Sequence, residues 1–415
     1  MREKIRLRWD KMLYVLGIIG PGIITANAGN DAGGIATYAT VGAKYGYKML
    51  WGLALITIGL AVVQEMNARM AVVTGKGLSD LIREKFGVKL TLFAMTILFI
   101  ANFGVVLGDF AGVAASMELF GVSKYISVPL VAAFVWILVS KGSYVKVEKI
   151  LMLFTFAFFG YIISAFMVRP DWNQVAVSVV TPSFPLEAGF ILTFIGMIGT
   201  TITPYMQFYL QASIVDKKLG LKDYKYEKMD VYIGSIWSNI VQFFIIVCTA
   251  GALFYVAQPQ IIDSAASAAL ALRPLAGNNA FILFGAGLFG ASVLAATIIP
   301  LSTSYAICEA FGWESGVDYT AKEAPAFFGI YSFIIFISAG LVLIPNLNLM
   351  NLILSTQQIA GVLTPIILTF MILLVNDRRI MGKYVNSKVQ NFIAYITVGA
   401  IVSVTIALVF AQFIL

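Results

Sequence analysis

The sequence contains no histidine, only two cysteines and few charged residues. Lys, Arg, Asp and Glu together make up 12% of its 415 residues. Without histidine the protein lacks the side chain that most often carries protons near neutral pH and most often binds metals. Cys248 and Cys308 both fall inside long apolar segments, so we interpret them as small buried residues rather than as a disulfide or a thiolate metal site. A nucleotide-binding loop, a catalytic triad and a metal-ligand cluster are also missing from the sequence, which argues against an enzyme and against a resident cofactor.

Long apolar segments dominate what is present. Hydrophobic residues make up 60% of the chain, and its mean hydropathy is +0.90, far above that of a soluble domain. Most segments reach the ~20 residues that a helix needs to cross the hydrocarbon core of a bilayer. We therefore predict an all-α integral membrane protein with about eleven transmembrane helices, the first of them retained rather than cleaved as a signal peptide. The segments cover approximately residues 12–41, 48–74, 90–119, 125–140, 147–168, 188–213, 230–257, 280–311, 325–344, 349–375 and 390–415.

Basic residues are distributed unevenly between the loops of this predicted bundle. Of the 28 Lys and Arg residues, 22 lie in the N-terminal arm and in the loops after the even-numbered segments. Because short translocated loops are depleted of Lys and Arg, we predict a plasma-membrane protein with a cytoplasmic N-terminus and a C-terminus outside the cell. The charged stretches at 79–87 and 216–230 are then cytoplasmic connectors. The net charge of +7 reflects this topology and contact with anionic lipids, and we expect no nucleic-acid partner.

Two apolar segments are interrupted by irregular sequence, ANAGNDAGG at 26–34 and IGMIGTTITPYMQ at 195–207. Helix breakers at corresponding positions of two halves indicate an inverted repeat with a discontinuous first and sixth helix. Non-helical backbone is tolerated inside a membrane only where it lines a cavity. The chain has no linkers, so we predict a single membrane domain over residues 1–415. We place its repeats at about 12–168 and 188–375, with an extra span at 390–415.

Asp31 is the strongest functional candidate, because an ionised side chain costs on the order of 3 kcal/mol or more at the centre of a bilayer. Its neighbours Ala28, Gly29, Gly33 and Gly34 are small, which leaves room for a cation and for carbonyl groups freed by an unwound helix. An aspartate that caps a second half-helix is the structural alternative. The two roles are compatible.

The interruption of the sixth segment contains a hydroxyl followed by a proline, Thr203 and Pro204, after Gly196 and Gly199. This pair can supply a hydroxyl and free carbonyl groups to an ion. It can equally be a proline kink in which Thr203 hydrogen-bonds to its own helix. The residues alone leave both interpretations open.

Other polar residues of the apolar segments have similar alternatives. Glu65 and Arg69 are four residues apart in the favourable order for an ion pair within one helix, and they could also latch a gate. Asp109 could stop a proton or a cation on its way, although Gly104, Gly108 and Gly112 around it equally indicate tight helix packing. Four amides could line a water path or bridge helices, namely Gln64, Asn239, Gln357 and Gln358.

The first segment, GPGIITANAGNDAGGIATYATVGAKYGYKMLW, resembles the first span of the Nramp (natural resistance-associated macrophage protein) divalent-metal transporters. The hallmark of that family is Asp-Pro-Gly-Asn, followed by Gly-Ala-x-Tyr-Gly-Tyr-x-Leu-Leu-Trp. Similar matches follow in the expected order, at VVTGKGLSDLIREKFG, ALRPLAGNNAFILFGAGLFGAS and STQQIAGVLTPIIL. The resemblance covers essentially the whole chain. It implies an eleven-helix LeuT-like fold with a metal site between the unwound first and sixth spans.

The resemblance also implies a ligand set and shows where this sequence departs from it. Gly34 stands where the family has its asparagine ligand, and Thr203 stands where it has a methionine. Tyr205 and Leu210 occupy the positions of two histidines of the family. In the third span, Val105 and Gly108 replace acidic residues of its proton path, with Asp109 one step away. The ligands carried over are Asp31, the carbonyl groups of Ala28 and Thr200, Thr203 and Gln357.

These departures have a chemical direction. A thioether favours softer transition metals, whereas oxygen ligands suit hard cations. Loss of the methionine and the asparagine should also enlarge the site, which suits magnesium because that ion keeps several of its waters. The pattern is similar to that of the Nramp-related magnesium transporters, so we expect a secondary transporter that works by alternating access on magnesium and also manganese. We expect a divalent metal ion and the bilayer to be its partners, and the sequence leaves the oligomeric state open.

With no histidine, and without the acidic residues that the family resemblance leads us to expect in the third span, we expect uptake that is not coupled to protons. The first alternative is a proton-coupled manganese or iron importer whose relay uses Asp109 and Glu65. A second alternative is a sodium-coupled amino-acid transporter of the same fold, but Asp31 would repel the carboxylate of its substrate. A channel is disfavoured because two broken helices that meet at an occluded midplane suit a carrier.

Overall fold

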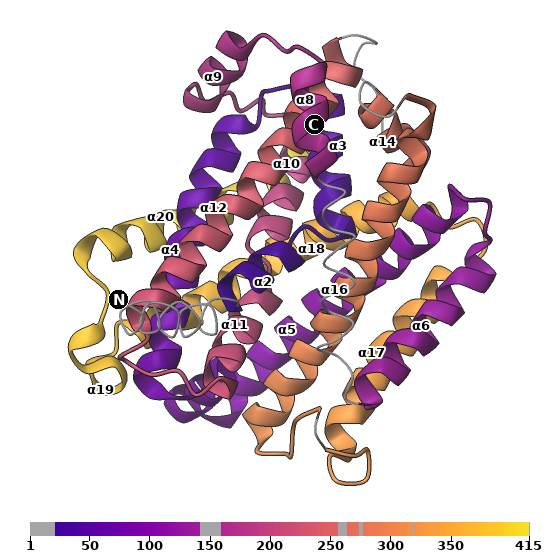
Figure 1. The fold of residues 1–415 in the computed structure, drawn as a ribbon. Helices are drawn as coiled ribbons and strands as arrows, with labels where there is room; N and C mark the ends of the chain where they lie inside the picture. Colours follow the sequence, from indigo (N-terminus) through magenta and orange to yellow (C-terminus); the bar gives the residue numbers. More distant parts are fainter. Residues whose placement is uncertain (1–20, 142–158, 256–263, 274–276, 318, 415) are drawn as a thin grey trace, which may run out of the picture.

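The computed structural model describes residues 21–141, 159–255, 264–273, 277–317 and 319–414. Within these ranges the chain forms helices joined by turns and loops, and no strand is present (Figure 1). The all-α class predicted from the sequence is therefore confirmed for the described part.

Eight helices of the described residues are long and apolar enough to cross a membrane. They are α4 (Leu50–Thr74), α5 (Leu78–Glu118), the pair α10 (Ala188–Thr201) and α11 (Pro204–Asp216), α12 (Tyr224–Thr249) with the π-helical turn η2 (Ala250–Phe254), α16 (Ala280–Phe311), α17 (Pro325–Val342), α18 (Leu349–Val375) and α20 (Lys388–Ile414). The shorter helices α2 (Pro21–Ala28), α3 (Ala32–Tyr45), α6 (Lys124–Ser140) and α8 (Phe159–Met167) occupy the first, fourth and fifth predicted segments. The first and fifth segments begin outside the described residues, so the number eleven stays a prediction.

Both charged connectors contain more helix than predicted. Residues 79–86 form the start of α5, which turns at Gly87, where φ is 74°. This stretch buries Leu78, Leu81 and Ile82 on one face, and that spacing suits an amphipathic helix. In the second connector, α12 already begins at Tyr224. The sequence interpretation placed the helices at 90–119 and 230–257, so it missed these helical starts, whose charges hide the helical periodicity.

The first predicted span is broken, with α2 ending at Ala28 and α3 beginning at Ala32. A break frees carbonyl groups at the end of the first half-helix, and these groups need partners away from water. Ser238 of α12 donates a hydrogen bond of 2.9 Å to the carbonyl of Ala26. At the other end of α2, the backbone N–H of Gly22 donates to Oδ2 of Asp230 at 2.7 Å. The interrupted helix is therefore held by α12.

The sixth predicted span is broken in the same way, between α10 and α11, at Ile202 and Thr203. Pro204 is the first residue of α11, a position where its missing N–H costs nothing. Thr364 of α18 donates 2.9 Å to the freed carbonyl of Ile202. The side chain of Thr203 makes no hydrogen bond to its own helix, so the interpretation as a simple proline kink was wrong.

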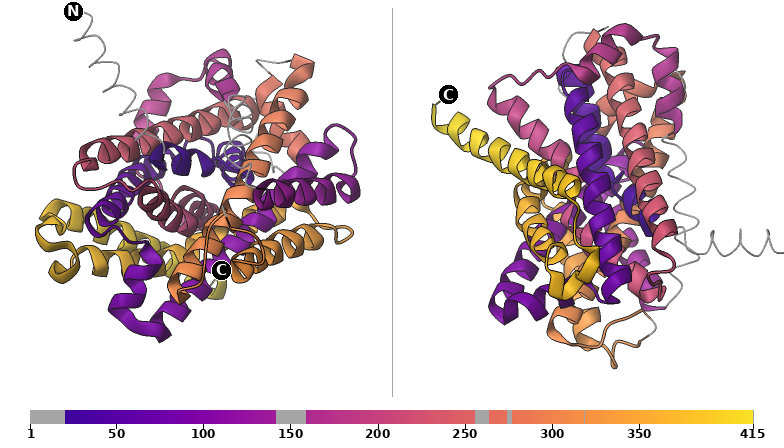
Figure 2. Two further views of the ribbon diagram at one scale, coloured as in Figure 1. Left: turned by 60° about the horizontal axis from the view of Figure 1, so that its bottom comes forward. Right: turned by 90° about the vertical axis from the view of Figure 1, so that its left-hand side faces the viewer.

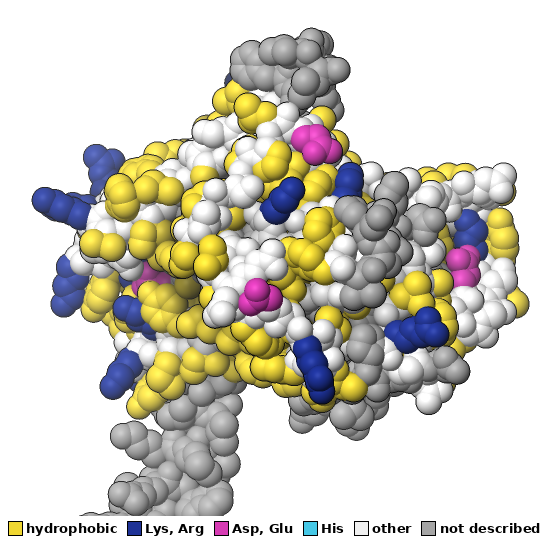
Figure 3. All heavy atoms as spheres, turned by 90° about the horizontal axis from the view of Figure 1, so that it is seen from above, with side chains coloured by type: hydrophobic (Ala, Val, Ile, Leu, Met, Phe, Trp, Pro, Cys, Tyr) yellow, Lys and Arg dark blue, Asp and Glu magenta, His cyan; other side chains and the backbone are white. Residues whose placement is uncertain are grey.

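The two broken spans lie at the centre of the bundle. Helix α12 packs against α2, α3 and α4 on one side, and α5 packs against α16 and α18 on the other. In Figure 1, α6 and α17 form a pair at the right-hand edge, and Figure 2 shows the C-terminal end of α20 standing away from the body. Seen from above, much of the surface is hydrophobic and charged side chains are scattered (Figure 3). Both breaks are thus enclosed by other helices.

Gly196 and Gly199 lie inside helix α10 and do not break it, contrary to the sequence interpretation. Gly199 allows α10 to approach α18 closely, because a Cβ there would lie 2.5 Å from the backbone nitrogen of Gly361. We expect Gly199→Ala to destabilise the protein by ~1–3 kcal/mol through overpacking. Gly340→Ala is the matched control, since a Cβ at that exposed helical glycine meets no atom within 4 Å. Thermal unfolding of both variants in one detergent measures the difference, and equal melting temperatures would contradict the close packing.

Candidate metal centre

Asp31 lies in the break of the first span and has one carboxylate oxygen in use and one free. Its Oδ1 accepts a hydrogen bond of 2.6 Å from the N–H of Gly34, which caps α3. Its Oδ2 has no hydrogen-bond partner, although the residue is only 1% exposed. Buried polar atoms without a partner are rare, and one on a carboxylate favours a cation. The two roles foreseen for Asp31, cap and ligand, are geometrically compatible.

The break of the sixth span faces this carboxylate through Thr200. A Cβ built on Gly34 would lie 3.2 Å from Thr200 Oγ1 and 3.5 Å from Asp31 Oδ1. A Cβ built on Gly29 would lie 3.6 Å from the carbonyl oxygen of Thr200. Thr200 therefore presents both its carbonyl and its hydroxyl to the first break, and the hydroxyl has no hydrogen-bond partner. The sequence interpretation included only the carbonyl.

Thr203 and Tyr205 add two more hydroxyl groups at the start of α11. Thr203 is 1% exposed and Tyr205 is fully buried, and their two hydroxyls lie close enough to interact with each other. Thr203 has the extended backbone of an N-cap residue, with φ −77° and ψ 145°. It is thus a hydroxyl ligand candidate that no helix cap uses.

Gln357 of α18 also lies beside the break of the first span. A Cβ on Gly33 would overlap the side-chain amide of Gln357, so the amide lies directly against the start of α3. Neither its Oε1 nor its Nε2 has a hydrogen-bond partner, and the residue is completely buried. Gln358, the neighbouring amide, is only partly buried and has its Cγ 3.5 Å from a Cβ built on Gly196. Of the two, Gln357 is the one that belongs to the centre.

Asp109 of α5 is a second buried carboxylate near the centre. It is completely buried, and the backbone N–H of Ala32 is its nearest hydrogen-bond donor. It is directed at the backbone N–H of Ala32 and lies close enough to Asp31 for the two charges to interact. The glycines around it also serve packing, since Gly108 contacts Thr356 and Gly112 contacts Ala32. Packing and a role at the centre therefore coexist on this helix.

Two expectations about the composition of the site need correction. A Cβ on Gly34 would lie 2.6 Å from the carbonyl oxygen of Gly29, so the missing asparagine leaves no open space there. The terminal methyl of Met206 contacts Gly29, which places a thioether beside the break although Thr203 itself carries none. The site is therefore neither enlarged at Gly34 nor free of sulfur in its surroundings. Sequence reasoning missed Met206, which follows Thr203 by three residues.

Sequence reasoning also missed a set of hydrogen bonds around the break of the first span. Gln242 of α12 donates 3.0 Å to the side-chain oxygen of Asn30, the residue before Asp31, and Ser238 donates to the same oxygen at 3.4 Å. Tyr38 and Thr201 share a hydrogen bond of 2.5 Å that joins α3 to the end of α10. These contacts fix the two breaks relative to each other. The adjacency of Asn30 to Asp31 was the available signal in the sequence.

Glu65 and Arg69 belong to a different cluster. They form the predicted ion pair, with Nε of Arg69 3.1 Å from Oε1 of Glu65, and both side chains are almost completely buried. Their further partners lie in the turn and helix after α19 (Arg378–Met381) and at the start of α12. A role as a gate latch stays a prediction.

The model of the natural resistance-associated macrophage protein-like (Nramp) family matches residues 22–411 of the chain. The divalent metal cation transporter MntH of Erwinia tasmaniensis is 29% identical over 304 residues, which cover 71% of this chain and 72% of MntH. The crystal structure of the Eremococcus coleocola manganese transporter, in complex with an aromatic bis-isothiourea substituted compound, has a TM-score of 0.77 at 17% identity and covers 94% of this chain and 85% of that one. MhsT in complex with L-phenylalanine has a TM-score of 0.55 at 14% identity and covers 95% and 97%. These likenesses confirm the predicted LeuT-like fold with two discontinuous helices.

Proposed function

The chain belongs to the natural resistance-associated macrophage protein-like (Nramp) family, and from this membership we propose that it transports divalent metal cations across a membrane. It is a multi-pass membrane protein. The observation that carries the proposal is the free carboxylate oxygen of Asp31, buried between two broken helices beside oxygens of Thr200 and Gln357 that have no hydrogen-bond partner. A carrier needs such a site, because an ion has to exchange part of its hydration shell for protein oxygens at the midplane.

The chemistry of the candidate ligands supports the proposal that hard ions, magnesium and also manganese, are the substrates. Their polar groups are carboxylate, hydroxyl, amide and backbone carbonyl, and the chain contains no histidine. Magnesium and manganese both accept oxygen ligands of this kind. The terminal methyl of Met206 lies against Gly29, so its thioether is near the break, and a sulfur ligand from it would favour manganese over magnesium. Magnesium as the main substrate is therefore the proposal that most needs a test.

Replacing Met206 by Leu separates the contribution of sulfur from that of oxygen. We expect Met206→Leu to lower manganese and cadmium uptake by about tenfold and to leave magnesium uptake nearly unchanged. Thr203→Met, which adds a second thioether, should shift the preference toward cadmium. Competition between magnesium and each of the other two ions in proteoliposomes measures the change. An unchanged order of preference in both variants would contradict the argument from ligand softness.

We further propose that transport is not coupled to protons. An inside-negative membrane potential supplies about 2.3 kcal/mol per charge per 100 mV, hence roughly twice that for a divalent ion, which is enough to drive uptake. One observation favours the alternative, a proton-coupled importer. Asp109 gives the centre a second carboxylate near Asp31, and such a group can take up a proton when the metal ion leaves.

Uptake of magnesium or manganese into proteoliposomes, with the internal pH recorded at the same time, distinguishes the two mechanisms. The uncoupled mechanism predicts metal uptake without internal acidification at a fixed membrane potential. Acidification in proportion to metal uptake, abolished in Asp109→Asn, would establish proton coupling and overturn the uncoupled proposal. Empty liposomes with the same ion gradients report the passive leak.

The membrane topology and the repeat boundaries remain part of the proposal. We place the N-terminus in the cytoplasm and the C-terminus outside, because the Lys- and Arg-rich loops define the inner face. Sodium-coupled amino-acid transport finds less support, since the free oxygen of Asp31 would repel a substrate carboxylate. The likeness to MhsT concerns the fold alone.

A further inference from the structure

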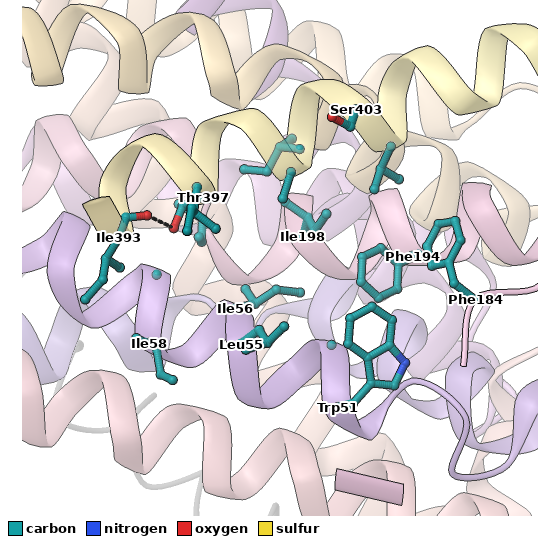
Figure 4. Close-up of a pocket in the computed structure, with 17 residues that line it drawn as sticks. Trp51, Leu55, Ile56, Ile58, Phe184, Phe194, Ile198, Ile393, Thr397 and Ser403 are labelled. Atoms are coloured by element: carbon teal, nitrogen blue, oxygen red, sulfur yellow. Dashed lines mark hydrogen bonds between the residues drawn. The ribbon is translucent and has the colours of Figure 1, made fainter. Parts of the chain in front are cut away.

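An apolar groove opens between α4, α10 and α20, on the surface of the bundle (Figure 4). It runs from Trp51 and Phe184 at one end to Gly59 and Thr397 at the other, and its volume is about 480 Å³. We call it the lateral groove. Figure 4 shows side chains of all three helices directed into the space between them.

The groove lies where α20 crosses α4 and α10, two of the helices against which it packs. A Cβ on Gly59 would lie 2.8 Å from Thr397 Oγ1, which marks this close crossing of α4 and α20. Further along, Val404 and Ala407 of α20 pack against Ile191 and Ile195 of α10, and only the last part of the helix stands apart from the body (Figure 2). Only 11% of the most apolar window of α20 is buried, against 44–83% in the other seven candidate spans. This helix therefore leaves a space beside α10 that no described side chain of the protein fills.

The lining of the groove offers a ligand no hydrogen bonds. Thr397 donates 2.8 Å to the carbonyl of Ile393 in its own helix, and Ser403 donates 2.8 Å to the carbonyl of Gly399. The indole N–H of Trp51 donates 3.1 Å to the carbonyl of Ser183. The other described residues of the lining are apolar. A water molecule would find no hydrogen-bond partner in such a site, whereas a hydrocarbon chain needs none.

We propose that the lateral groove binds one acyl chain of a bilayer lipid. The three helices that form it are membrane spans, so the hydrocarbon of the bilayer is the medium that faces it. Its volume of about 480 Å³ and its extent along three helices leave room for a long stretch of one acyl chain. Trp51 at one end suits the interface, where the headgroup of such a lipid lies.

The position of the groove gives the bound chain a consequence for transport. Ile198 and Ile202 of the sixth span line it, and Ile202 lies in the break after α10, directly before Thr203 of the candidate metal centre. A chain in the groove packs behind the unwound segment, against both α10 and α4, and would oppose a movement of α10 away from α4. This consequence depends on the proposed transport function, whereas the binding itself does not.

Photolabelling tests the binding on the full-length protein in lipid nanodiscs. The probe is a phosphatidylcholine with a diazirine in the middle of one acyl chain, added at low mole fraction. We expect labels to concentrate on residues 55–59 of α4 and on α10, and Ala400→Phe, which fills the groove, to reduce them at least fivefold. Val402→Phe adds the same side chain to a partly exposed position of α20 outside the lining, and it should leave the labelling unchanged.

Three outcomes would overturn the proposal. One is labelling spread over the lipid-facing surface in proportion to its exposure, and another is equal labelling of wild type and Ala400→Phe. The third is a groove covered by α20 of a second copy, seen as cross-links between copies together with absence of lipid label. None of these readouts uses metal uptake, so the lipid site and the transport function can fail separately. As a second measurement, added phosphatidylcholine should raise the melting temperature of wild type and of Val402→Phe in detergent, and most of that rise should be lost in Ala400→Phe.

Discussion

Asp31→Asn is expected to abolish divalent metal uptake while the protein stays folded. The asparagine oxygen can still accept the hydrogen bond from the N–H of Gly34, so the cap of α3 is retained. The substitution removes the negative charge, and the carboxylate is the strongest ligand of the proposed ion site. Residues that merely support a metal ligand already change affinity by about 10–100-fold, so loss of the carboxylate should cost at least roughly 100-fold in uptake.

Two further variants make this result interpretable. Asp171→Asn is the matched control, because Asp171 also caps a helix, α9 (Trp172–Val180), but lies exposed outside the membrane centre. It should transport at the wild-type rate. Asp31→Ala removes both charge and cap, and should lose some thermal stability in addition to transport. Binding measured by isothermal titration in detergent separates lost affinity from slow transport. Wild-type rates in Asp31→Asn would show that the ion is held elsewhere.

The fold was predictable from the sequence to the level of spans and breaks. Apolar length fixes where a helix crosses a membrane, and the breaks near Asp31 and Pro204 were visible because Gly, Asp and Pro are rare in such helices. The helical start of α5 was not predictable in the same way. Its charged residues are typical of a loop between spans. Only the packing of the folded chain shows that Leu78, Leu81 and Ile82 share a buried face.

The candidate metal centre was better predictable in its residues than in its shape. Asp31 and Gln357 stand out as polar residues in apolar spans and Thr200 follows from the family resemblance, and the structure places all three beside the start of α3, while their role as ligands stays a prediction. The approach of the Gly29 carbonyl to Gly34 depends on how the break folds, which spacing does not specify.

Met206 and Asp109 show a second limit of the sequence. Which face of a helix points at the centre depends on how that helix is rotated within the bundle. In a helix that is apolar all round, hydrophobic periodicity does not reveal this rotation. The contact of Met206 with Gly29 and the proximity of Asp109 to Asp31 therefore needed the three-dimensional arrangement.

Arg69→Ala is expected to destabilise the protein by ~3–5 kcal/mol, since removal of one partner leaves a buried charge uncompensated. Glu65 is completely buried, and Gln390 of α20 donates 2.7 Å to its Oε2. Arg69 itself donates 2.7 Å to the carbonyl of Tyr384 and 2.5 Å to the side chain of Asn386, so it ties α4 to the turn before α20. Scanning fluorimetry in detergent should show a large drop in melting temperature.

The size of that drop, and its partial reversal, distinguish a buried pair from an ordinary surface one. Lys76→Ala breaks the Lys76–Glu84 pair of 2.5 Å, whose side chains are 45% and 53% exposed, and should cost under ~1 kcal/mol. The double variant Glu65→Gln with Arg69→Met removes both charges and should recover much of the stability lost in Arg69→Ala.

A role of the pair as a gate latch predicts a change in transport rate as well as in stability. If Glu65 and Arg69 hold a gate, the double variant transports at an altered rate per folded molecule, because the connector before α20 is released from α4. If they only neutralise each other, that rate equals the wild-type rate once the amount of folded protein is normalised.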